Sequence, residues 1–199
     1  PMLSGTYPDV IEQLAVTDRP QINAGDMAII NQPLDFLGVN YYTRTVFKAN
    51  QQHGFSDVPA SGDGLTTMGW EVYAKGLTEI LLTLDRQYDN LPPIYITENG
   101  IATADSCNKG EVDDVMRIDY FQSHLLAVHD AINHGVDIRG YFAWSLMDNF
   151  EWAEGYTQRF GIIYVDYNTQ QRTFKNSAKA LQKLFLARQS QHHAVEDIC

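Results

Sequence analysis

Residues that could do chemistry follow three segments with the character of buried strands. These segments, at 36–42, 94–97 and 139–146, are mostly apolar and aromatic. Each leads into side chains with chemical potential: Asn40-Tyr41-Tyr42, Glu98-Asn99-Gly100 and Trp144-Ser145-Leu146. In parallel α/β folds the chemistry collects at the edge of the sheet where the strands end. We therefore expect these side chains to meet at one site.

Glu98 is a carboxylate that directly follows a strand. A single Glu in this position is most simply a solvated loop acid, because function has to be argued from a site. The neighbouring residues favour a second interpretation. Thr97 and Asn99 can donate hydrogen bonds, and Gly100 permits a tight turn away from the strand. Under this interpretation Glu98 points into the crevice at the end of the sheet.

A loop rich in aromatic and polar residues follows the third segment. Its members are Trp144, Asp148, Asn149, Glu151 and Trp152. Aromatic side chains most often fill a core, and these residues, like Phe160 further along, allow that interpretation. A core would have to satisfy the interleaved polar groups, whereas a sugar packs its C–H faces on aromatic rings and needs acceptors for its hydroxyls. Carbohydrate is thus the favoured class of ligand.

Helical segments separate the three strands, which predicts β/α units with a parallel sheet because parallel neighbours need a crossover. The other expected elements are short helices at 7–14 and 26–31, a loop up to residue 68, helices at 76–88 and 113–134, a hairpin with arms at 161–167 and 172–174, and a last helix at 176–188. Gly76 is expected to mark a helix start, Asp113 to cap the next helix and Gly135 to end it.

Composition excludes several classes of function. The chain has 199 residues, with 25 Asp or Glu against 14 Lys or Arg, so its formal net charge is −11. That charge disfavours nucleic acid and anionic membrane surfaces as partners. Cys107 and Cys199 have no disulfide or metal spacing and the His residues form no ligand set, so we expect no metal and no cofactor. Without a membrane span or a signal-peptide pattern, we expect a cytoplasmic protein.

Several stretches of the chain carry a more specific signal. In order they are Asp35 to Tyr42, Gly69-Trp70, Ile96 to Gly100, Gly140 to Trp152, Gly155-Tyr156, Arg159-Phe160-Gly161, and Arg172 with Lys175, Ser177 and Ala178. Together they resemble the C-terminal part of a family 1 glycoside hydrolase, the β-glucosidase group of (β/α)8 barrels. The resemblance runs from Gly5-Thr6-Tyr7-Pro8 to about Leu186. It implies an α/β fold, a partial (β/α)8 TIM barrel.

The resemblance implies that Glu98 is the catalytic nucleophile, which attacks the anomeric carbon and forms a covalent glycosyl intermediate. Tyr42 would hydrogen-bond Glu98 and help to hold it ionised and oriented. Asn40 lies two residues before Tyr42 on the same strand face, so we expect it to support the same group.

Five further residues are assigned to the sugar site by the same resemblance. Glu151 would accept hydrogen bonds from the glycone hydroxyls, and Trp152 would assist through its indole nitrogen. Trp144 would stack under the glycone ring, Phe160 would close the pocket, and Trp70 would line the aglycone side.

One part of the family pattern is missing. Retaining hydrolysis needs a second carboxyl group about 5–5.5 Å from the first, and the family takes it from an Asn-Glu-Pro segment that does not occur here. The residues alone would suggest Glu151 as this acid. The resemblance argues against that and gives Asp148 a structural role in its loop.

By the order of the motifs, the three strands are the sixth, seventh and eighth of the barrel. We therefore interpret residues 1–199 as a single incomplete barrel domain with a disordered or extended tail at about 189–199. A sheet of three parallel strands leaves its edges and one face open, so we expect self-association or a complementary N-terminal half.

Two functions follow. In the first, the chain is a β-glucosidase-type retaining hydrolase of terminal β-D-glucosides or short β-linked oligosaccharides, acting through a glycosyl-enzyme on Glu98. In the alternative, it is a catalytically silent truncated fragment, or a sugar-binding or assembly module, that lacks the acid/base segment.

Overall fold

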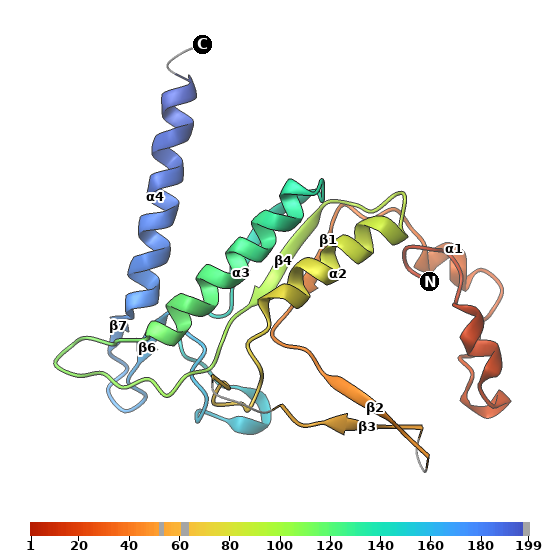
Figure 1. Ribbon diagram of the computed structural model, residues 1–199, viewed down its shortest axis with the longest axis horizontal. Helices are drawn as coiled ribbons and strands as arrows, with labels where there is room; N and C mark the ends of the chain where they lie inside the picture. Colours follow the sequence, from red (N-terminus) through yellow and green to blue (C-terminus); the bar gives the residue numbers. More distant parts are fainter. Residues whose placement is uncertain (52–53, 61–63, 197–199) are drawn as a thin grey trace.

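A parallel sheet of three strands forms the centre of the molecule in the computed structural model, which describes residues 1–51, 54–60 and 64–196. The strands are β1 (Leu37–Asn40), β4 (Ile94–Asn99) and β5 (Ile138–Ala143), in the order β1-β4-β5. Both pairings are parallel, which confirms the expected α/β architecture with crossover helices. Because both pairings are parallel, the carboxyl ends of all three strands lie at the same edge of the sheet, as Figure 1 shows for β1 and β4.

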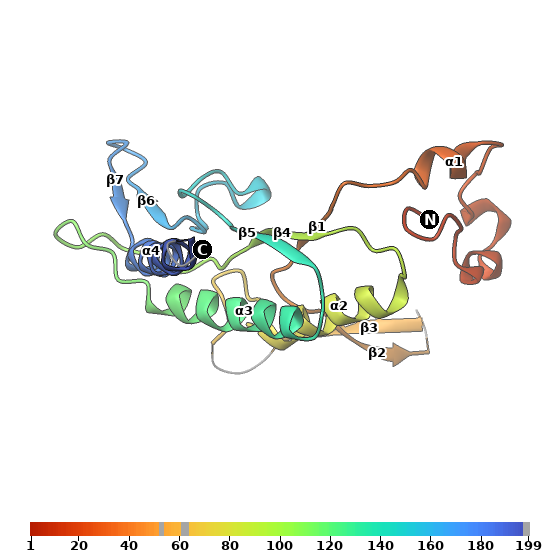
Figure 2. The same ribbon diagram turned by 90° about the horizontal axis from the view of Figure 1, so that it is seen from above.

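Two helices cover one face of this sheet, as Figures 1 and 2 show. They are α2 (Ala74–Gln87) and α3 (Val115–Asn133). Ile94 and Ile96, alternate residues of β4, are fully buried against Leu77 and Leu81 of α2 and Val128 of α3. Alternate strand residues share a face, so the intervening Tyr95 and Thr97 lie on the opposite side. Among the described residues no helix covers that opposite side.

The remaining elements lie before and after this unit. They are η1 (Asp9–Gln13), η2 (Val16–Asp18), α1 (Asp26–Ile30), η3 (Trp152–Glu154), the antiparallel pair β6 (Ile163–Val165) and β7 (Arg172–Phe174), and α4 (Asn176–Glu196). The β6–β7 hairpin was expected, with a longer first arm. Within the described part of the chain, no helix is long and apolar enough to cross a membrane.

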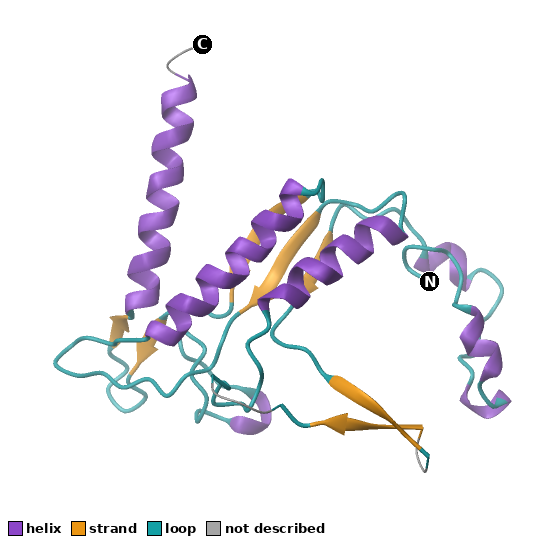
Figure 3. Ribbon diagram, in the orientation of Figure 1, coloured by secondary structure: helices purple, strands orange, loops and turns teal. Residues whose placement is uncertain are grey.

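A second hairpin occurs where a loop was expected. It consists of β2 (Val46–Asn50) and β3 (Gly54–Val58), and it projects from the body of the molecule (Figure 3). The rings of Phe47 and Phe55 pack edge to face with centroids 5.2 Å apart. Both strands are largely exposed, and polar residues separate their apolar positions. The segment therefore has the composition of a loop.

The starts of two helices differ from the expectation. α2 begins at Ala74, and Gly76 lies within its first turn. A Cβ on Gly76 would lie 2.3 Å from the Tyr41 hydroxyl, so this glycine permits a close approach of Tyr41 and does not mark the helix start. The residue before α3 is Asp114 and not Asp113. Gly135, with φ of 101°, ends α3 as expected.

The expected extended or disordered tail at about 189–199 is also corrected. α4 continues to Glu196, because the residues after Arg188 include neither Gly nor Pro and favour a helix. Residues 197–199 lie outside the described part of the chain. The start of α4 packs on α3, where Leu181 joins Tyr120 and Phe121 in a second apolar cluster.

Candidate active site

Tyr42 and Glu98 form the centre of the candidate site at the edge of the sheet. Glu98 is the fifth residue of β4, and Tyr42 lies two residues beyond β1. The Tyr42 hydroxyl donates to Oε2 of Glu98 over 2.6 Å, which confirms the hydrogen bond implied by the resemblance. Burial raises the pKa of Tyr42, and the hydrogen bond to Glu98 and its charge raise it further. Tyr42 therefore stays protonated as a donor.

The other carboxylate oxygen of Glu98 has no hydrogen-bond partner within the described residues. Glu98 itself is only half-buried. A carboxylate with one oxygen held by a donor and the other open is oriented and still able to attack an electrophile.

Aromatic rings gather around this pair. The ring centroids of Trp70 and Phe160 lie 5.7 and 6.0 Å from that of Tyr42, and 6.2 Å from each other. Phe160 is buried and Trp70 is half-buried, so Phe160 backs the group while Trp70 keeps one side towards solvent. Tyr42, Trp70 and Phe160, which the sequence analysis assigned to one site, therefore lie together.

Glu151 and Trp144 form the second polar pair of the site. The indole nitrogen of Trp144 donates to Oε1 of Glu151 over 3.3 Å. Burial raises the pKa of Glu151, the bond from Trp144 opposes that rise, and the negative charge of Glu98 adds to it. The charge of Glu98 therefore influences the ionisation of Glu151.

Trp152, which the resemblance assigns to the glycone hydroxyls, is 86% exposed at the start of η3, and Trp144 is the tryptophan that donates to Glu151. One expected side-chain contact is not formed. Asn40 was expected to support Glu98. Its Oδ1 accepts from the Thr97 hydroxyl over 2.6 Å, because the register of β1 and β4 shifts at this point.

The residues that flank Glu98 both donate hydrogen bonds, as expected. The Thr97 hydroxyl donates to Asn40, and Asn99 donates to the Tyr41 carbonyl and to the Tyr120 hydroxyl. A Cβ on Gly100 would lie 1.8 Å from the carbonyl oxygen of Trp144. Gly100 is therefore required because two chain segments come close together there, and not because the chain needs a tight turn.

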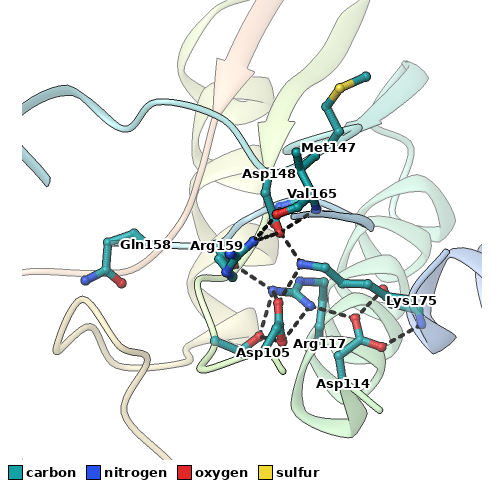
Figure 4. A network of polar contacts seen from close by, with 12 residues as sticks. Asp105, Asp114, Arg117, Met147, Asp148, Gln158, Arg159, Val165 and Lys175 are labelled. Carbon is teal, nitrogen blue, oxygen red and sulfur yellow. Dashed lines mark hydrogen bonds and ion pairs between the residues drawn. The ribbon is translucent and has the colours of Figure 1, made fainter. Parts of the chain in front are cut away.

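A buried ion network holds the loop that carries Trp144 and Glu151 (Figure 4). Asp148 accepts from Lys175 over 2.8 Å and from Arg159 over 2.5 Å, and also from the backbone nitrogens of Gly161 and Val165. This geometry agrees with the structural role expected for Asp148. It fixes the loop after β5 against the start of α4.

The same network continues to the start of α3. Lys175 also bonds Asp105 over 2.5 Å, and the fully buried Arg117 bridges Asp105 and Asp114 over 2.8 and 2.6 Å. Burial favours a higher pKa for Asp105, but Arg117 and Lys175 outweigh it and hold that pKa low. Burial lowers the pKa of Lys175, against the raising effect of its carboxylate partners.

Sequence reasoning singled out several of these residues without connecting them. Asp105 and Lys175 are 70 positions apart, and no local spacing rule pairs them. In the described part of the chain no group of three or more His, Cys, Asp or Glu side chains could hold a metal ion.

Comparison with known proteins gives one consistent family. Residues 1–190 match the model of the family described as Glycosyl hydrolase family 1. A β-glucosidase of Agrobacterium sp. is 46% identical over 184 residues, which are 90% of this chain and 40% of that protein. β-Glucosidase A of Thermotoga maritima is 42% identical, covering 89% of this chain and 40% of that protein.

Solved structures agree with these relatives. The virulence factor SghA of Agrobacterium tumefaciens, in complex with its substrate analog salicin, superposes with a TM-score of 0.84 at 45% identity, over 89% of this chain and 40% of that one. A family 1 glycoside hydrolase of Thermotoga maritima, complexed with a cyclophellitol analogue, superposes with a TM-score of 0.85 at 41% identity, over 92% and 41%. The chain thus spans about 40% of the length of the curated relatives it matches.

Proposed function

The chain belongs to glycosyl hydrolase family 1, and from this membership we propose that it carries the nucleophile side of a retaining β-glucosidase site. The observation that carries the proposal is the 2.6 Å hydrogen bond from Tyr42 to Glu98, formed between the ends of two neighbouring strands. The second carboxylate, Glu151, is electrostatically coupled to Glu98 and held by Trp144.

In the proposed first step, the open oxygen of Glu98 attacks the anomeric carbon of a β-glucoside. A bond forms between that carbon and the Glu98 oxygen while the glycosidic bond breaks, and the departing aglycone oxygen takes the electron pair and a proton from an acid/base carboxyl that the complementary segment supplies. Tyr42 keeps the other Glu98 oxygen in place throughout. In the second step water gives a proton to that same acid/base carboxylate and attacks the same carbon, which releases the sugar with its original configuration and restores the Glu98 carboxylate.

Glu151 and the aromatic residues are proposed to bind the sugar. The raised pKa of Glu151 reflects its burial, and its bond from Trp144 orients it as an acceptor for glycone hydroxyls. Trp144 offers a ring face to the glycone, and Trp70, on the more open side of the cluster, faces the aglycone. Terminal β-D-glucosides are the proposed substrates, supported by relatives that are named β-glucosidases.

We assign β1, β4 and β5 to the sixth, seventh and eighth strands of a (β/α)8 barrel. Three observations support this proposal. In the described part of the chain, β1 and β5 are edge strands of the sheet, and no helix covers one of its faces. The chain also spans only about 40% of the length of its relatives. The other strands and the acid/base carboxyl are proposed to come from a segment equivalent to the rest of those relatives, in this polypeptide or in another. Until that segment joins, leaving groups that need a proton should react slowly, since a general acid is worth about 10²–10⁴-fold.

The test compares this chain with a fusion in which it replaces the matching segment of the Agrobacterium β-glucosidase. The substrates are 2,4-dinitrophenyl β-D-glucoside, whose leaving group needs no proton, and methyl β-D-glucoside, which needs one. The fusion should hydrolyse both, and Glu98→Ala should lower both rates by orders of magnitude. Glu111→Ala, at an exposed loop position, is the matched control. Equal rates for the parent fusion and Glu98→Ala would contradict the proposal.

If the fusion is active and the 199-residue chain is inactive even on the dinitrophenyl glucoside, the chain alone is a silent fragment that needs its complement. That outcome would leave the role of Glu98 intact and decide between the two functions considered for the isolated chain.

A further inference from the structure

A buried polar cluster lies behind the Tyr42–Glu98 pair without touching the carboxylate. It consists of Asn99, Tyr120 and Tyr141, from β4, α3 and β5. Asn99 is fully buried and Tyr120 is 1% exposed. Burying such groups is costly unless their hydrogen bonds are made, so their arrangement needs an explanation.

Asn99 joins the ends of all three strands. Its Nδ2 donates to the carbonyl of Tyr41, beyond β1, over 2.7 Å, and to the hydroxyl of Tyr120 over 3.0 Å. Its Oδ1 accepts from the hydroxyl of Tyr141 on β5 over 2.6 Å. Its own carbonyl accepts from the backbone nitrogen of Trp144 over 2.9 Å. Both amide protons are used, so the side chain has one favoured orientation.

Tyr120 extends this arrangement to Tyr42 itself. Its hydroxyl accepts from Asn99 and donates to the carbonyl of Tyr42 over 3.1 Å. The last backbone hydrogen bond between β1 and β4 runs from the Tyr41 nitrogen to the Glu98 carbonyl. After that bond the chain leaves the sheet. The Asn99 side chain then donates to the Tyr41 carbonyl, and the Tyr120 hydroxyl donates to the Tyr42 carbonyl.

We propose that Asn99 and Tyr120 are positioning residues for the reaction, which fix the backbone of Tyr42 so that its hydroxyl meets Glu98. This inference rests on the proposed function of Glu98. The three side chains are hydrogen-bonded to one another, with Asn99 and Tyr120 buried and Tyr141 half-buried, and such networks hold a single geometry more firmly than isolated bonds do. Because Tyr120 belongs to α3, the position of that helix helps to set the position of Tyr42, whose hydroxyl donates to Glu98.

The hydroxyl of Tyr120 is suited to this role across a wide pH range. Burial raises the pKa of Tyr120, and hydrogen bonds from Asn99 and the backbone of Gly100 only partly oppose the rise. The hydroxyl therefore remains a donor to the Tyr42 carbonyl under all conditions in which the enzyme would work. A phenylalanine would fill the same space without that bond.

The experiment uses the fusion with the Agrobacterium relative described above. Tyr120→Phe removes one hydroxyl, and Tyr88→Phe, at the far end of α2, is the matched control. For Tyr120→Phe we expect kcat on 2,4-dinitrophenyl β-D-glucoside to fall about 10-fold, since small displacements of reacting groups are costly, with KM changed less than about 2-fold.

A purely structural role would lower the melting temperature and leave kcat and KM of the folded protein unchanged; that result would overturn the proposal. If the Tyr120→Phe fusion does not fold, Tyr141→Phe, which removes only the bond to Asn99 Oδ1, carries the same test with a smaller expected change in the same direction. An inactive parent fusion would instead contradict the proposed function, so the two failures are distinguishable.

Discussion

The hydroxyl of Tyr42 lies 2.6 Å from Oε2 of Glu98, although the two residues are 56 positions apart. Parallel pairing of β1 with β4 creates this proximity, because it brings the ends of the two strands to one edge. The pair is therefore a product of the sheet, and its removal should affect chemistry more than folding.

Tyr42→Phe should slow hydrolysis of 2,4-dinitrophenyl β-D-glucoside by the fusion about 10- to 100-fold. A hydrogen bond to a charged group is worth roughly 1.5–3 kcal/mol, which corresponds to this range. Steady-state kinetics measure the effect. Thermal unfolding should change little in comparison, and an unaltered kcat would show that the Tyr42 bond has no part in the reaction.

The pKa of Glu151 should depend on both Trp144 and Glu98. Burial raises its pKa above the ordinary value of 4.5, Trp144 lowers it by donating a hydrogen bond, and the charge of Glu98 raises it. The pKa of Glu151 should thus fall in Glu98→Gln and rise in Trp144→Phe. Titration of the Glu151 carboxyl carbon by NMR measures both shifts, and two shifts in the same direction would contradict the described site.

Lys175→Met should destabilise the protein by about 3–5 kcal/mol, because it leaves Asp105 and Asp148 buried without this partner. Lys179→Met, one turn further along α4 and exposed, should stay within about 0.5 kcal/mol of the parent. Denaturant unfolding of the three proteins gives the comparison. Equal losses for both variants would mean that the ion network contributes no special stability.

His124 should make stability depend on pH. Burial lowers its pKa from 6.5 to about 4, while its bond to the Tyr120 carbonyl opposes the change. Between these values the unfolded chain takes up a proton that the folded chain excludes, so stability is lost as the pH falls. The loss from this group amounts to roughly 3 kcal/mol at 1.36 kcal/mol per pKa unit.

His124→Phe should therefore lose less stability than the parent between pH 7 and pH 4. Urea unfolding at both pH values measures the difference, with exposed His129→Phe as the control. Parallel pH dependence in His124→Phe and the parent would show that His124 is protonated as easily in the folded chain as in the unfolded one.

The strands and the two crossover helices could be predicted from sequence because each depends on local periodicity, whereas the Tyr42–Glu98 contact was implied by the family resemblance. Ile94 and Ile96 alternate with half-buried residues, and the helix over 115–133 ends at a glycine in the left-handed conformation. Chemistry at the end of β4 follows once the parallel sheet is known.

Features that depend on distant partners could not be predicted in this way. Asn99 bonds to Tyr120 and Tyr141, 21 and 42 positions away, and the sequence indicated only that it can donate hydrogen bonds. The role of Gly100 depends on the approach of Trp144, which only the paired strands reveal. Short exposed strands such as β2 and β3 bury little, so their composition resembles that of a loop.

The most direct test of the central claim is to trap the glycosyl-enzyme. The fusion is incubated with 2,4-dinitrophenyl 2-deoxy-2-fluoro-β-D-glucoside, whose fluorine slows hydrolysis of the intermediate, and is then digested for mass spectrometry. The account predicts one fluoroglucosyl group on the peptide that contains Glu98, and none in Glu98→Gln. A label on Glu151 or elsewhere, or an equal label in Glu98→Gln, would contradict the assignment of Glu98 as the nucleophile.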